Sequence, residues 1–400
     1  MRITRSHLSF LVLAVASSIF PTAFAACTDD DGTPKLGSPD AATIDAPPST
    51  TGDAGRGDAT TVDATTSDAK TTDAGDASNS DGAPDGAIRY SCGAFSESPG
   101  WTVAAGFRAV VLAKDNGLNQ PVALTFARGP YAGLLYVINQ GDNVLRRIDT
   151  NTGVVSSFTA AAQWGAKAPV VLTTITWDEE SVLDGQLYVG DQGGDGDGDS
   201  TIYRVGTSGT ASTFVTGPGP GLDDIFGLSF APKGSAYPQG LYATGDTDGV
   251  GVDWGVYLST VDAGVAFSEV AGSEGISFVK LPSFGGTLLA SRPAGGGYAG
   301  ADEVSRLLAD GGLGTPLATT LPGIHAVTYS TGGAFGGNVY VASWSTGKLT
   351  RIDSAGAQTE LASGLTLTNY DGNILAVSPD GNTMMVADRG ANRVVCIEPI

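Results

Sequence analysis

The chain has 400 residues, and its 42 acidic residues outnumber its 21 Lys and Arg residues, which gives a formal net charge of −21. So acidic a chain repels nucleic-acid phosphates and anionic lipid headgroups, and we expect neither to be a partner. Its only cysteines are Cys27, Cys92 and Cys396.

The first residues have the pattern of an export signal. Arg2 and Arg5 precede an apolar run over residues 8–20, and an Ala-x-Ala sequence follows at residues 23–25. A basic start, a short apolar segment and small residues are typical of a secretory signal, and the apolar run is too short to span a membrane. We predict a signal peptide over residues 1–26.

Two kinds of processing are compatible with the residues around Cys27. Phe24-Ala25-Ala26-Cys27 resembles a bacterial lipobox, which implies a lipid on Cys27, whereas simple secretion after cleavage at Ala25 is the alternative. An odd cysteine in an exported chain needs a use, and Cys27 is left over if Cys92 and Cys396 pair. We therefore expect a protein that is lipid-anchored in a bacterial cell envelope, periplasmic or surface-exposed, with a secreted protein as the alternative.

Residues 27–89 have a composition that favours disorder. The segment is rich in Asp, Ala, Thr, Ser, Gly and Pro, and an Asp-Ala pair recurs every five residues from Asp53 to Asp73. Such a stretch buries too little apolar surface to offset its chain entropy. We predict an extended acidic linker that holds the next domain away from a membrane.

Residues 90–400 contain a repeat that predicts one all-β domain. Six apolar strands share a Leu-Tyr-Val-like signature, and its central residues are spaced by 52, 54, 47, 51 and 45 residues. These central residues are Tyr136, Tyr188, Tyr242, Leu289, Tyr340 and Met385. The period suits propeller or solenoid repeats, and each copy shows an inner strand before the signature and further strands after it. Four strands in each of six repeats predict a six-bladed β-propeller.

The ends of the repeat region predict how the ring closes. The last repeat stops after the strand at residues 393–397, and a spare strand at residues 107–113 precedes the first repeat. Pairing these two strands would complete the sixth blade and leave no open edge. Cys92 and Cys396 would then lie close enough for a disulfide in an oxidising compartment, with two separate buried thiols as the alternative.

Two segments carry a resemblance to known propellers. Residues 373–394 (Asn-Ile-Leu-Ala-Val-Ser-Pro-Asp-Gly-Asn-Thr-Met-Met-Val-Ala-Asp-Arg-Gly-Ala-Asn-Arg-Val) and residues 136–149 resemble repeats of NHL-type propellers. They are also similar to the SMP-30/gluconolactonase group and to quinoprotein sugar dehydrogenases. The resemblance extends over nearly all of residues 100–400 and implies the fold, whereas unrelated activities share it.

The lactonase resemblance also implies a divalent metal held by Glu, Asn and Asp at the starts of the inner strands. Aligned repeats place Val122, Thr173, Phe226, Ser277, His325 and Asn373 at that position. Only Asn373 matches the family's residue type, Asp224 and Asp371 fall two residues earlier, and no Glu is near. Asp224, His325, Asp371 and Asn373 are therefore the candidate channel ligands, and a water-filled polar channel is the alternative.

A turn after the second signature strand predicts a calcium site. Asp191, Asp195, Asp197 and Asp199 alternate with glycine-rich spacers, so that several carboxylates can converge on one hard cation. A solvated Gly-Asp turn without metal is the alternative. Ca²⁺ is the only cofactor that we expect.

Trp164, Trp254 and Trp344 fall in or beside turns and suggest an aromatic platform, or packing against the blade rim. We expect a monomeric surface binding or scaffold module for a protein, peptide or glycan, which meets the membrane only through its lipid anchor. The alternative is a metal-dependent hydrolase of the SMP-30/lactonase type with its site at the channel mouth.

Overall fold

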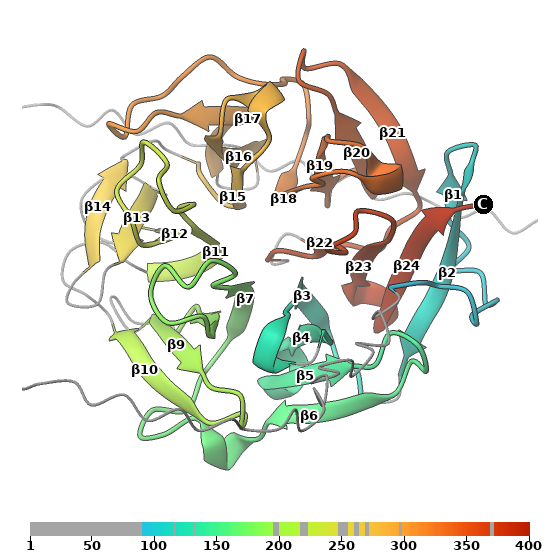
Figure 1. Ribbon diagram of the computed structural model, residues 1–400, viewed down its shortest axis with the longest axis horizontal. Helices are drawn as coiled ribbons and strands as arrows, with labels where there is room; N and C mark the ends of the chain where they lie inside the picture. The colour runs from blue at the N-terminus through green and yellow to red at the C-terminus, as the bar shows by residue number, and fades with distance from the viewer. Residues whose placement is uncertain are drawn as a thin grey trace, which may run out of the picture. The chain divides into compact units, whose positions relative to one another are not determined.

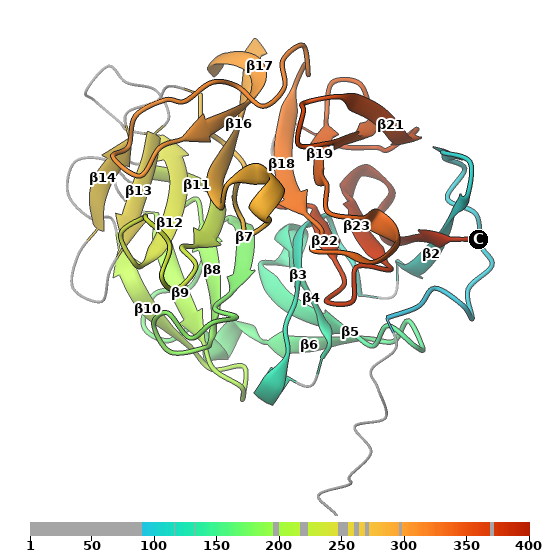
Figure 2. The same ribbon diagram turned by 45° about the horizontal axis from the view of Figure 1, so that its top comes forward.

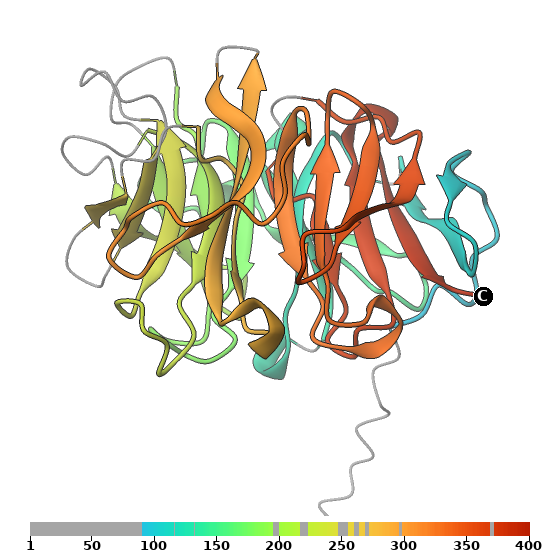
Figure 3. The same ribbon diagram turned by 90° about the horizontal axis from the view of Figure 1, so that it is seen from above.

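The computed structural model describes residues 90–115, 117–131, 133–194, 200–216, 223–246, 255–259, 264–268, 272–295, 298–368 and 372–400. In this part of the chain, six antiparallel sheets stand around a central axis, as Figure 1 shows when viewed along that axis. Seen from the side, the strands run along the height of the ring (Figure 3). The predicted all-β, six-bladed propeller is confirmed.

Each blade begins with a strand beside the axis and continues outward along the chain. The inner strands are β3 (Pro121–Phe126), β7 (Leu172–Trp177), β11 (Asp223–Phe230), β15 (Ile276–Val279), β18 (Ile324–Tyr329) and β22 (Leu375–Val377). The second strands are β4 (Leu135–Asn139), β8 (Leu187–Asp191), β12 (Leu241–Asp246), β16 (Thr287–Gly295), β19 (Val339–Ser343) and β23 (Met384–Asp388). The third strands are β5 (Val144–Ile148), β9 (Thr201–Val205), β13 (Gly255–Ser259), β17 (Tyr298–Leu307), β20 (Lys348–Ile352) and β24 (Arg393–Pro399).

The outer positions vary more than the inner ones. The outer strands are β6 (Val155–Thr159), β10 (Ala211–Thr216), β14 (Gly264–Ser268), β21 (Gln358–Ser363) and β2 (Phe107–Lys114), and β1 (Thr102–Val103) is added beyond β21. Short 3-10 helices lie in the turns: η1 (Gly129–Tyr131), η2 (Gln140–Asp142), η3 (Ala161–Gln163), η4 (Pro282–Phe284), η5 (Gly333–Phe335) and η6 (Arg389–Ala391). Among the described residues, no helix is long and apolar enough to cross a bilayer.

The signature tyrosines explain why the second strand is the most regular part of the repeat. Tyr136, Tyr188, Tyr242 and Tyr340 are all buried, so each ring fills the space between neighbouring blades. The hydroxyl of Tyr136 donates a hydrogen bond to the Tyr131 carbonyl at 3.1 Å, and Tyr242 donates to the Pro238 carbonyl at 2.9 Å. A buried phenol needs such a partner, and here the partner lies in the turn that enters the strand. The signature thus fixes both the strand and its preceding turn.

Blade 4 departs from the four-strand pattern. Its described part contains only β15, β16 and β17, and the segment that follows makes only isolated bridges, one of them between Val304 and Ala318. Gly311, Gly312, Gly314 and Pro316 occupy this segment. Glycine weakens a strand and proline cannot donate to its ladder, which accounts for the missing outer strand.

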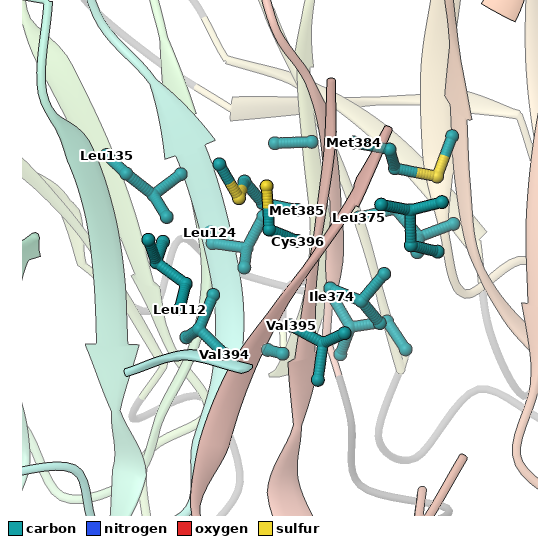
Figure 4. Packing of buried hydrophobic residues seen from close by; sticks show 14 of the residues in the cluster. Leu112, Leu124, Leu135, Ile374, Leu375, Met384, Met385, Val394, Val395 and Cys396 are labelled. Atoms are coloured by element: carbon teal, nitrogen blue, oxygen red, sulfur yellow. The ribbon is translucent and has the colours of Figure 1, made fainter. Parts of the chain in front are cut away.

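The ring closes at blade 6. Strand β2 pairs antiparallel with β24, with Val110 opposite Cys396, and Cys92 and Cys396 form a disulfide whose Cα atoms are 5.8 Å apart. Figure 4 shows Cys396 among Leu112, Leu124 and Met385, which come from β2, β3 and β23. The seam between the chain's two ends is therefore both cross-linked and packed with apolar side chains.

Candidate functional site

All six blades contribute to a cavity at the end of the channel where the inner strands finish. The cavity has a volume of about 220 Å³ and is lined by the last residues of the inner strands and by the turns after them. We call it the mouth cavity. Figure 2 shows how inner strands such as β3, β7, β18 and β22 converge around the axis.

Aromatic and hydroxyl-bearing side chains lie next to one another around the mouth cavity. The last residue of an inner strand is aromatic in four blades, and the residue before it carries a hydroxyl in the same four. These pairs are Thr125 and Phe126, Thr176 and Trp177, Ser229 and Phe230, and Thr328 and Tyr329, and all eight line the cavity. Rings and hydroxyls side by side suit a ligand that has both apolar faces and hydrogen-bonding groups.

Charged side chains stand at the edge of the mouth cavity. Lys280 contacts Glu179 at 3.1 Å and Glu180 at 2.6 Å, measured from its amino nitrogen to a carboxylate oxygen. Burial alone would lower the pKa of Lys280, but the hydrogen bond that its ammonium group donates to Glu180 and the nearby charges raise it above its ordinary value. Lys280 therefore stays protonated and holds two acidic side chains in fixed positions.

The floor of the mouth cavity is formed by the segment that leads into β22. A Cβ atom added at Gly372 would lie 1.9 Å from the Thr173 carbonyl oxygen and 3.4 Å from that of Phe226, so this backbone reaches across to blades 2 and 3. Asn373 follows and lines the cavity. Its side-chain oxygen is buried and has no hydrogen-bond partner in the described part of the chain. A buried acceptor without a partner is unfavourable and indicates a place where a ligand can donate a hydrogen bond.

A second candidate site lies at the starts of the inner strands of blades 4 and 5. The alignment of the repeats missed one of its residues, because it misplaced the inner strand of blade 4. Ser277 pairs with the signature residue Leu289 in blade 4, as Thr328 pairs with Tyr340 in blade 5. The blade 4 residue equivalent to His325 is therefore Glu274 and not Ser277, which lines the mouth cavity instead. This error of three residues in the alignment hid Glu274, so the expectation that no Glu lies near the channel ligands was wrong.

Glu274 and His325 form a buried pair between blades 4 and 5. The His325 Nδ1 atom lies 2.7 Å from Glu274 Oε2, and both side chains are at most 3% exposed. Burial raises the pKa of Glu274 above its ordinary value, although the neighbouring imidazole acts in the opposite direction. Trp344 stacks edge-on against the imidazole ring, with ring centres 6.2 Å apart. A carboxyl group that orients an imidazole is an arrangement suited to proton transfer.

The pKa shift of Glu274 predicts how stability depends on pH. The unfolded chain loses this proton near pH 4.5, whereas the folded chain keeps it to higher pH, so folding stability falls as the pH rises above 4.5. Each unit by which the pKa of Glu274 differs between the folded and unfolded chain corresponds to about 1.4 kcal/mol in the free energy of unfolding. We expect Glu274→Gln, which cannot ionise, to gain stability relative to the natural chain between pH 4.5 and 7.5 in denaturant unfolding. The exposed control Glu97→Gln should show no such trend, and a pH-independent difference for Glu274→Gln would contradict the prediction.

The remaining predicted channel ligands do not join this pair in the described part of the chain. Asp224 lies near the start of β11, in the irregular stretch before Gly227, and has a left-handed backbone (φ 47°), and Asp371 lies outside the described residues. Asn373 belongs to the mouth cavity. Among the described residues, no three His, Cys, Asp or Glu side chains are grouped so that they could hold a metal ion.

The predicted calcium turn is only partly described. Asp191 is fully buried, and its carboxylate accepts hydrogen bonds from the backbone amides of Val170 (3.0 Å) and Val171 (2.7 Å). In blades 1 and 6, the side chains of Asn139 and Asp388 lie at the same end of the second strand and also accept a hydrogen bond from a backbone amide of the loop before the inner strand. The interaction is therefore a structural feature of the repeat. Asp195, Asp197 and Asp199 lie outside the described residues, and calcium binding there stays a prediction.

Of the predicted tryptophan platform, Trp164 is buried against Tyr203 and Trp254 lies outside the described residues. Trp177 is the tryptophan that lines the mouth cavity. The sequence contained a signal for it, because Phe126, Trp177, Phe230 and Tyr329 occupy equivalent positions in the aligned repeats. Their shared aromatic character could have indicated the cavity.

Known proteins resemble this chain in structure but not in sequence. No protein-family model and no curated protein matches the chain in sequence. A gluconolactonase of Xanthomonas campestris matches in structure with a TM-score of 0.53 and 14% identity, over 74% of this chain and 91% of that one. The PQQ-bound aldose sugar dehydrogenase of Streptomyces coelicolor matches with a TM-score of 0.50 and 16% identity, over 74% and 99% of the two chains. A Bacteroides thetaiotaomicron protein of unknown function matches with a TM-score of 0.50 and 9% identity, over 73% and 76%. These matches and the six sheets confirm the predicted resemblance, in fold, to β-propellers of the gluconolactonase type.

Proposed function

We propose that this chain is an exported β-propeller, anchored through a lipid on Cys27, that binds a small polyhydroxylated molecule such as a sugar in its mouth cavity. The observation that carries this proposal is the unpartnered side-chain oxygen of Asn373 on the cavity floor. The anchor rests on the sequence alone, because residues 1–89 lie outside the described residues.

The lining of the cavity supports a sugar over other small ligands. Sugar hydroxyls can donate to Asn373 and exchange hydrogen bonds with Thr125, Thr176 and Thr328, while the C–H faces of a sugar ring pack on aromatic rings such as Trp177. Two structural neighbours are by name enzymes of sugars or sugar lactones, which agrees with this ligand class.

The proposal predicts a specific loss of binding in Asn373→Leu. Leucine has similar volume but cannot accept a hydrogen bond, and the loss of a buried hydrogen bond to a ligand costs about 1–3 kcal/mol, or roughly a tenfold to hundredfold weaker affinity. We expect this loss in calorimetric titration of the full chain with a panel of aldoses and polyols. Asn151→Leu makes the same exchange in an exposed turn and should bind as the natural chain does.

Trp177→Ala should weaken the same sugars, because it removes a ring from the cavity wall. Two results would contradict the proposal. One is that no sugar or polyol in the panel binds the natural chain, and the other is that Asn373→Leu binds the same sugar equally well.

A hydrolase is the second candidate, and the Glu274–His325 pair favours it. A buried carboxyl group can orient an imidazole that accepts a proton from water, as attack on a lactone or ester requires. The same panel of variants separates the two candidates. Lactone turnover that is lost in Glu274→Gln but retained in Asn373→Leu would favour a hydrolase with its site at the starts of the inner strands.

A further inference from the structure

A groove continues outward from the mouth cavity between blades 3 and 4. It has a volume of about 660 Å³ and shares Glu180, Pro232 and Lys280 with the mouth cavity, so the two hollows adjoin. Its far end is lined by Arg306 and Leu308, at and just beyond the end of the third strand β17. The hollow therefore extends from the inner strands past the third strand and is suited to an elongated ligand.

The groove is wide because glycine forms part of its walls. A Cβ atom added at Gly234, Gly285 or Gly286 would meet no atom within 4 Å. Leu308 is 46% exposed, whereas Tyr237 and Phe284 are buried beneath the groove. The walls thus combine glycine backbone that no other group covers with an apolar contact surface.

The charges of the groove are opposite in sign to those of the chain as a whole. Glu180, its acidic residue, contacts Lys280 at 2.6 Å and also accepts a hydrogen bond from the Lys233 backbone amide at 2.6 Å, while Lys280 also contacts Glu179. The Lys233 side chain is exposed and makes no ion pair with any described residue, and neither does Arg306, which donates only to the Thr315 carbonyl at 3.2 Å. Three cations, Lys233, Lys280 and Arg306, thus line the groove with one carboxylate. In a chain of net charge −21 this excess of positive charge indicates a local preference for an anionic group.

We propose that the mouth cavity and the groove together bind an acidic oligosaccharide, with one sugar unit in the mouth cavity and carboxylate-bearing units along the groove. This inference rests on the proposed function, because the mouth cavity supplies the sugar-binding end. Lys233 and Arg306 then select acidic over neutral oligosaccharides, and Arg306 can bind a carboxylate with two parallel hydrogen bonds.

Calorimetric titration of the full chain with tetragalacturonate and with neutral maltotetraose tests this selection. We expect the acidic tetramer to bind at least about tenfold more tightly at low salt, and the preference to shrink as salt rises. Lys233→Glu combined with Arg306→Glu should abolish the preference. Lys114→Glu combined with Lys348→Glu reverses the same number of charges at exposed sites elsewhere and should retain it.

Each other outcome is informative. Equal binding of the two tetramers, still dependent on Asn373, would overturn the inference and leave the proposed function intact. Failure of every sugar to bind would overturn both. If a tetra-aspartate peptide binds as tightly as tetragalacturonate, the groove recognises charge alone and the assignment to an oligosaccharide is wrong. If Lys233→Glu with Arg306→Glu does not fold, Lys233→Gln with Arg306→Gln tests the same cations and should reduce the preference in part.

Discussion

Replacing both Cys92 and Cys396 by alanine is expected to lower the free energy of unfolding by about 3–5 kcal/mol. The disulfide joins residues that are 304 positions apart, so it removes the entropy of a loop that includes nearly the whole propeller. Its loss should also weaken the seam, because β2 is then joined to the sixth blade by its pairing with β24, by the hydrogen bond from Arg108 to Glu398 and by the packing around Cys396. Guanidinium unfolding of the full chain, followed by tryptophan fluorescence, measures the loss.

Chemical reduction of the Cys92–Cys396 disulfide in the natural chain is the control, because it removes the cross-link without replacing the two side chains. It should reduce stability by nearly the same amount as the double replacement, whereas the double variant should not respond to the reducing agent. Cys27→Ala leaves the disulfide in place and should unfold as the natural chain does. A loss below about 1 kcal/mol in the double variant would mean that the hydrogen bonds that Glu398 accepts from the backbone amide of residue 92 and from Arg108 hold the seam without the cross-link.

The sequence predicted the fold well because the repeat carries several independent signals. The Leu-Tyr-Val signature marks a strand whose tyrosine must be buried and hydrogen-bonded, and the strand count at the two ends predicts the pairing of β2 with β24. In blade 4, however, the alignment of the inner strand fails. Blade 4 has Leu289 in place of tyrosine, and the alignment of the repeats places the inner strand of this blade three residues too late.

The candidate site was harder to predict than the fold, because side chains from different blades make it. Glu274 is separated from His325 by 51 positions, and neither residue belongs to a local motif. The mouth cavity is likewise a property of all six blades, and no single repeat shows it. Only the common position of the four aromatic residues relates the cavity to the sequence.

Gly275→Ala is expected to cost more than about 3 kcal/mol of stability, an unusually large effect for the addition of one methyl group. A Cβ atom at this position would lie 1.7 Å from the His325 carbonyl oxygen and 2.8 Å from its carbon. Both atoms belong to the backbone, so no side-chain rotation can relieve the clash, and blades 4 and 5 must separate. Separation would break the hydrogen bonds of the Ser291 hydroxyl, which accepts from the Gly275 amide at 2.7 Å and donates to the His325 carbonyl at 2.5 Å.

Gly332→Ala is the matched control, because its backbone is extended (φ 175°) and an added Cβ atom would meet nothing within 4 Å. It should change stability by no more than about 0.5 kcal/mol. Because the Gly275→Ala clash acts on the backbone of His325, the variant should also pull the imidazole away from Glu274 and alter the pH dependence that this pair confers. If Gly275→Ala instead unfolds within about 1 kcal/mol of the natural chain and keeps that pH dependence, blades 4 and 5 can move apart at the starts of their inner strands without disturbing the pair. That result would mean that the close contact between the backbones of Gly275 and His325 does not position Glu274 against His325.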